Sequence, residues 1–132
     1  MDWSNDNINK YLSRIEGSII KGRYNLALKL ANRLLKRYYR SFITTKIPTE
    51  IEKENLRKMS VCISKYLVQH NRNCSIPYSE RRLLMMAITT DVVDIHNLYT
   101  HESEEDSIVD HATATYVFEN VKSVVRYLRR YF

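Results

Sequence analysis

Apolar residues recur at intervals of three and four along most of the chain, which is the spacing that places side chains on one face of an α-helix. Five segments show this pattern and predict helices, at approximately residues 6–18, 24–44, 48–70, 78–98 and 104–130. The second segment has the most regular stripe, formed by Ala27, Leu30, Ala31, Leu34, Leu35, Tyr38 and Phe42. It is the clearest amphipathic helix in the chain.

Residues with known roles at helix starts divide this pattern. The third helix is predicted to begin at Pro48, because Thr49 and Glu52 then match a capping box. Ser103 and Asp106 form a second capping box and predict the start of the fifth helix. The last two helices are expected to bury two further stripes, Leu84, Ile88, Val92, Ile95 and Tyr99 in one and Ile108, Ala112, Val117, Val121, Val124 and Leu128 in the other.

Glycine and proline are scarce, with two of each in 132 residues. All-β domains need many turns built from these residues, so the counts favour helices. Two glycines also cannot supply the loop of a Rossmann or P-loop nucleotide site. An apolar share of 44% and a charged share of 27% are typical of a globular domain. The sequence therefore predicts an all-α fold, a compact antiparallel bundle of four to five helices, with residues 1–132 forming a single domain.

The sequence indicates neither a membrane segment nor a disulfide framework. No apolar run approaches the roughly 18 residues of a membrane span, and the polar N-terminus does not resemble a signal peptide. Cys62 and Cys74 form no CxxC pair and are too few for a disulfide scaffold. We therefore expect a cytoplasmic protein with reduced cysteines and no cofactor, with Cys62 placed in the core.

Basic residues are distributed unevenly along the chain. The net charge is +6, and residues 17–49 contain eight lysines and arginines but no acidic residue. Five of these bases form a stripe along the predicted second helix, namely Lys29, Arg33, Lys36, Arg37 and Arg40. Such a stripe can bind the phosphates of RNA, and Tyr24, Tyr38 and Tyr39 could stack on its bases. The alternatives are a solvated face that binds nothing and tyrosines that pack in the core.

Two histidines lie near the predicted junction of the fourth and fifth helices. His96 and His101 are five positions apart, with Asn97 between them and Asp94 close in sequence. Histidine exchanges protons near neutral pH, so this segment is a candidate for general acid–base catalysis. Histidines in helices are also common as packed or capping residues. A zinc site that combines the pair with His111 and an acid fits no familiar ligand spacing, so we predict no metal.

Two stretches of the sequence resemble the HEPN superfamily, particularly the domain at the C-terminus of abortive-infection proteins. GRYNLALKLANRLL (residues 22–35) is similar to the family's G-x-Y-x-x-A-L helix, in which an acid usually follows the paired leucines. Here that position is Lys36. IHNLYTH (residues 95–101) resembles the family's signature of Arg, a polar residue, three to five others and His. The order of helices matches over most of the chain.

The resemblance implies a metal-independent endoribonuclease of a phage-defence or toxin–antitoxin system. It also implies a homodimer in which the two signature motifs face each other across the interface. Asn97 then takes the polar position and His101 that of the catalytic His, whereas His96 stands where the family has Arg. Arg is always charged and binds phosphate through two parallel hydrogen bonds, which His does not do reliably at pH 7. The implied protein is therefore either an active enzyme or an inactive derivative.

Two functional classes stay open at this point. RNA can be cleaved without metal if His96 and His101, in one chain or across a dimer, act as general base and general acid. A lysine or arginine must then stabilise the transition state. The alternative is a non-catalytic helical module that dimerises beside Leu98 and Tyr99 or binds a protein partner such as a nucleotidyltransferase. The basic stripe favours RNA, and the missing motif Arg favours the interaction module.

Overall fold

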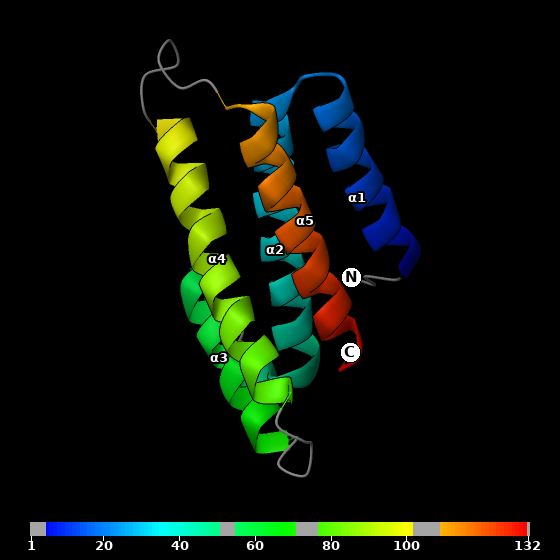
Figure 1. The fold of residues 1–132 in the computed structure, drawn as a ribbon. Helices are drawn as coiled ribbons and strands as arrows, with labels where there is room; N and C mark the ends of the chain where they lie inside the picture. Colours follow the sequence, from blue (N-terminus) through cyan, green and yellow to red (C-terminus); the bar gives the residue numbers. More distant parts are fainter. Residues whose placement is uncertain (1–4, 51–54, 71–76, 102–108, 132) are drawn as a thin grey trace.

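The computed structural model is an all-α bundle that describes residues 5–50, 55–70, 77–101 and 109–131 (Figure 1). Its helices are, in chain order, α1 (Asn5–Ile20), α2 (Tyr24–Lys46), the short 3-10 helix η1 (Pro48–Glu50), α3 (Leu56–His70), α4 (Pro77–His101) and α5 (His111–Arg129). The described ranges contain no strand, so the predicted all-α class is confirmed. Within the same ranges, no helix is long and apolar enough to cross a membrane.

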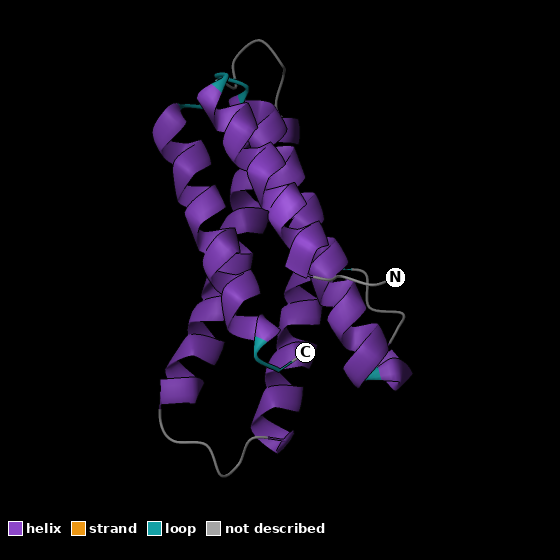
Figure 2. Cartoon of the chain, turned by 90° about the vertical axis from the view of Figure 1, so that its right-hand side faces the viewer, coloured by secondary structure: helices purple, strands orange, loops and turns teal. Residues whose placement is uncertain are grey.

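α2 is the central helix and packs against each of the other four α-helices. Seen from the side, the helices extend along a common long axis (Figure 2). The buried side chains of α2 are Ala27, Leu28, Leu30, Ala31, Leu34, Leu35, Tyr38, Tyr39, Phe42 and Ile43, which include every member of the predicted stripe. Because apolar contacts hold α2 on most of its circumference, the remaining side faces solvent as a fixed, straight surface.

α2 and α3 run in the same direction, whereas the other helices that follow one another in the sequence are antiparallel (Figure 1). Phe42, near the end of α2, contacts Tyr66, near the end of α3, with ring centroids 5.8 Å apart. α3 therefore begins further back along the bundle than the end of α2. An immediate helix start after α2 would have produced an antiparallel pair instead. The ends of α2 and α3 consequently lie at the same end of the bundle.

The third helix begins later than the capping box predicted. Pro48 and Thr49 form the 3-10 turn η1, and Glu52 lies outside the described residues. α3 begins at Leu56, where the side-chain Oδ1 of Asn55 accepts hydrogen bonds from the backbone N–H groups of residues 57 and 58 at 2.9 and 3.2 Å. The predicted start at Pro48 is therefore wrong, because the N-cap is Asn55, six positions after Thr49.

The fifth helix also begins later than predicted, at His111. Asp110 is its N-cap and accepts a hydrogen bond from the backbone N–H of Thr113 at 2.7 Å. This hydrogen bond lowers the pKa of the Asp110 carboxyl. The proposed capping box at 103–106 and Ile108 lie outside the described residues, and Ala112, predicted to be buried, is exposed in the first turn. The rest of the predicted stripe, from Val117 to Leu128, is buried as expected.

A buried hydrogen-bond chain links α2 to α4. The hydroxyl of Thr89 donates to the backbone oxygen of Met85 at 2.7 Å, so the Tyr39 hydroxyl donates to Thr89 at 2.6 Å. Burial raises the pKa of the Tyr39 hydroxyl and raises that of Tyr38 to about 12, with the nearby charge of Arg129 opposing the shift at Tyr38. Both tyrosines are therefore core residues and cannot stack on RNA bases.

The fourth helix presents a slightly different face to the core than its apolar pattern predicted. Met85 is buried with Ile88 and Val92, whereas Leu84 is 55% exposed. Cys62 of α3, predicted in the core, is only partly buried and lies beside it. Both differences arise because α2 contacts α3 and α4 from one side, which leaves the flanks of these two helices open to solvent.

Candidate functional site

The predicted RNA-binding residues form one continuous basic surface, here called the α2 basic face and consisting of Lys29, Arg33, Lys36, Arg37 and Arg40. All five side chains are exposed. With 3.6 residues per turn, their positions fall within an arc of about 100° and extend about 16 Å along the helix axis. No ion pair joins any of them to another residue in the described ranges. Their charges are therefore available to an external anion.

The core explains why the cations gather on this side of α2. Leu34 and Tyr38 direct the opposite side of the helix into the bundle, where their exposed fractions are 0% and 1%. A lysine or arginine placed there would lose its hydration, so the charges are confined to the solvent side. The first turn of α2 contains no acid that could neutralise them. The face thus combines a rigid backbone with a uniform sign of charge.

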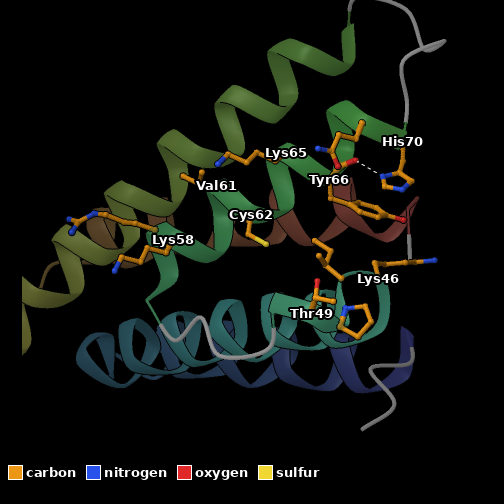
Figure 3. Close-up of a pocket in the computed structure, with 12 residues that line it drawn as sticks. Lys46, Thr49, Lys58, Val61, Cys62, Lys65, Tyr66 and His70 are labelled. Carbon is orange, nitrogen blue, oxygen red and sulfur yellow. Dashed lines mark hydrogen bonds between the residues drawn. The ribbon is translucent and has the colours of Figure 1, made fainter.

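A pocket of about 610 Å³ lies between α3 and the corner formed by the end of α2 and η1 (Figure 3). Its lining residues are Lys46, Ile47, Pro48, Thr49, Arg57, Lys58, Val61, Cys62, Lys65, Tyr66, Gln69 and His70. We call it the α2–α3 pocket. Sequence patterns gave no indication of it, because it forms only where the parallel α2 and α3 come together.

The rim of the α2–α3 pocket is basic. Lys58 and Lys65 of α3 are exposed, and Lys46 lies in the last turn of α2. Arg57, by contrast, forms an ion pair with Asp94 on α4. Lining residues from the described ranges include no carboxylate. The pocket therefore continues the positive character of the α2 basic face toward α3.

The aromatic wall of the pocket is built from Tyr66 and His70, which lie one turn apart on α3. Their rings stack with centroids 4.1 Å apart and planes inclined by 23°. The Nδ1–H of His70 donates to the backbone oxygen of Tyr66 at 3.0 Å, which fixes the imidazole at the end of the helix (Figure 3). The i,i+4 spacing was visible in the sequence, but nothing there indicated a neighbouring cavity.

The two histidines proposed for catalysis occupy positions on one helix, α4. α4 continues to His101, so no helix junction separates this residue from His96. Five positions correspond to a rotation of about 140°. The position of His96 lies within about 40° of Met85, Thr89 and Val92, on the core side of α4. The backbone of a single chain therefore places these two positions on different sides of α4.

The local surroundings of these candidate residues differ. His96 is partly buried and has an interaction partner, whereas Asn97 is exposed. The His101 side chain lies outside the described residues. His111 is the exposed first residue of α5 rather than a residue further inside that helix, and its ring meets Tyr24 edge-on at 5.7 Å. Among the described residues, no three His, Cys, Asp or Glu side chains lie close enough to hold a metal ion.

The comparisons with known proteins give no family assignment. No protein-family model, no curated protein and no solved structure matches this chain. The resemblance to the HEPN superfamily therefore stays a prediction that depends on the two quoted motifs.

Proposed function

We propose that this protein is an RNA-directed helical domain that binds the phosphate backbone of single-stranded RNA along the α2 basic face. The observation that carries the proposal is the exposure of five cations on one side of a rigid helix, without an ion pair to any described residue. Arginine and lysine held in this way release counterions when they meet phosphates, which favours binding. The HEPN-like motifs favour RNA over DNA as the nucleic acid.

Charge reversal on α2 tests the proposal directly. The triple variant R33E/R37E/R40E should weaken binding of a labelled single-stranded RNA by about tenfold or more. R126E/R130E is the matched control for the double variant R33E/R37E, because both variants reverse two exposed arginines four positions apart. Equal losses in both variants would show a general charge effect and would contradict a site on α2. A matched single-stranded DNA measures the preference for RNA.

Cleavage of the bound RNA is the catalytic form of this proposal. His101 takes the position of the family's catalytic histidine, and Asn97 that of its polar residue. Since the positions of His96 and His101 are about 140° apart around α4, this arrangement favours acid–base catalysis across two copies of the chain. The α2 basic face could then hold the strand while the α4 ends of a homodimer perform the chemistry. The alternative is an RNA-binding derivative without activity.

An interaction module is the second candidate function, and one surface of α4 favours it. Leu83, Leu84 and Leu98 are exposed by 52%, 55% and 50%, and their positions lie within an arc of about 100° that also contains exposed Ala87. Exposed leucines on one helix face are typical of a surface that a second protein or a second copy covers. Sedimentation at tens of micromolar tests self-association, and L84K/L98K should shift a dimer to the monomer. A wild-type monomer would leave only a different protein as the partner.

A further inference from the structure

The α2–α3 pocket has the size and shape of a small-molecule site. Its volume of about 610 Å³ falls inside the range of roughly 300–1,000 Å³ that is usual for ligand pockets. Its apolar lining residues include Ile47 and Pro48, which follow α2, and Val61 and Cys62 of α3. The pocket thus offers an apolar interior for a flat or compact group.

The charges at its rim point to an anionic ligand. Lys46 and His70 stand at the ends of α2 and α3, where the negative end of a helix dipole favours a cation without any ligand. Lys58 and Lys65 have no such explanation, because they lie in the first and middle turns of α3. No described residue forms an ion pair with either lysine. These two ammonium groups are therefore the ones that a bound anion would neutralise.

The aromatic wall indicates what the anion carries. Tyr66 lines the pocket, and its ring is already fixed by His70 on one face and by the edge contact with Phe42. A fixed ring next to an apolar interior binds a planar heterocycle with little loss of side-chain freedom. The Tyr66 ring, the apolar interior and the two lysines together match a planar heterocycle that carries an anionic group.

We propose that the α2–α3 pocket binds a nucleoside phosphate, with the phosphate at Lys58 and Lys65 and the base against Tyr66. The ligand is either a free nucleotide or the nucleotide at one end of a bound RNA. The first case is independent of the proposed function, and the second depends on it. In the second case the pocket holds the terminal nucleotide of an RNA strand that the α2 basic face binds.

Calorimetric titration of the full chain tests this assignment with AMP, UMP, adenosine and inorganic phosphate. Each mononucleotide should bind about tenfold or more tightly than adenosine or phosphate alone, because only the nucleotide uses both halves of the pocket. Equal affinity for AMP and phosphate would overturn the role of Tyr66. Absence of AMP binding would refute the pocket while leaving RNA binding along α2 intact.

Charge variants locate the site. K58E/K65E should weaken AMP binding by about tenfold or more, and the milder K58Q/K65Q should weaken it less. Both lysines are exposed, so circular dichroism should show an unchanged helical content. K29E/R33E introduces the same change of charge on α2 at residues that do not line the pocket, and it should leave AMP binding unaltered. AMP binding that survives K58E/K65E but fails in K29E/R33E would move the site to α2 and overturn the assignment.

An RNA arm separates the two sources of the nucleotide. If the pocket holds the end of an RNA, K58E/K65E should weaken oligo(U) binding as well as AMP binding, and AMP should compete with the RNA. If the pocket takes a free nucleotide, oligo(U) affinity should change only in the α2 variants. AMP binding without any RNA binding would refute the proposed function and retain the pocket.

Discussion

The salt dependence of RNA binding provides the sharpest test of the α2 basic face. Removing Arg33, Arg37 and Arg40 as R33A/R37A/R40A deletes three of the five exposed cations and leaves Lys29 and Lys36. Single-stranded nucleic acid contributes a slope of about −0.7 in log K against log[salt] for each phosphate contact. Five contacts predict a slope of about −3.5 for the wild type, and two contacts predict about −1.4 for the variant.

These slopes translate into affinities that an anisotropy titration can resolve. Between 0.1 and 0.4 M salt, the wild type should lose about a hundredfold in affinity and the variant only about sevenfold. Alanine at exposed helix positions does not disturb the buried side of α2, so thermal unfolding should stay close to wild type. The control variant R126A/R130A, which removes two exposed arginines at the end of the chain's last helix, should keep the wild-type slope. A variant slope equal to that of the wild type would show that the α2 arginines do not meet phosphates, and it would refute the reasoning.

Four further predictions concern chemistry and stability. If the protein cleaves RNA with EDTA present, His101→Ala should lower the rate by about a hundredfold or more, and unchanged cleavage would exclude His101 as the catalytic residue. His96→Arg should raise the rate if a phosphate clamp is missing and lower it if His96 transfers a proton. Thr89→Val should lower the free energy of unfolding in urea by about 1–3 kcal/mol, because it leaves the buried Tyr39 hydroxyl unpaired. Tyr39→Phe should lower it by less, about 1 kcal/mol. The opposite order would contradict the assignment of Tyr39 as the donor to Thr89. Asp110→Ala should lower the melting temperature at neutral pH. Because the folded-state pKa of Asp110 is depressed, the stabilisation by its carboxylate is present above the unfolded-state pKa and is lost as the pH falls through the folded-state pKa. A difference in melting temperature between Asp110→Ala and wild type that persists unchanged in strong acid would contradict the carboxylate cap.

The helical fold could be predicted from the sequence because its strongest signals are local. The stripe from Ala27 to Phe42 repeats over several turns, and each member is buried in the structure. Helix starts were predicted less well because the chain offers several capping residues, and the competition between Thr49 and Asn55 is decided by which helix face can reach the core. Leu84 and Met85 are adjacent and similarly apolar, so only packing against α2 selects Met85 for burial.

The candidate sites depended more strongly on tertiary structure. Exposure of the α2 basic face followed directly from its position opposite the apolar stripe. His96 and His101 were close in sequence, but whether they share a surface depended on α4 continuing through both. The α2–α3 pocket could not be predicted, because no local pattern states that two successive helices run in the same direction.

That shared direction of α2 and α3 affects how the chain can be assembled. α1 with α2 and α3 with α4 each form an antiparallel hairpin of neighbouring helices, whereas α2 and α3 cannot pair through a short turn (Figure 1). Each hairpin is rich in contacts that are local in sequence, and such units form early and behave cooperatively. We therefore expect two assembly units that meet through α2, with α5 completing the bundle. Hydrogen exchange should show α1 and α2 opening together and α3 and α4 opening together, and two fragments divided between residues 50 and 55 should reassociate into the native fold.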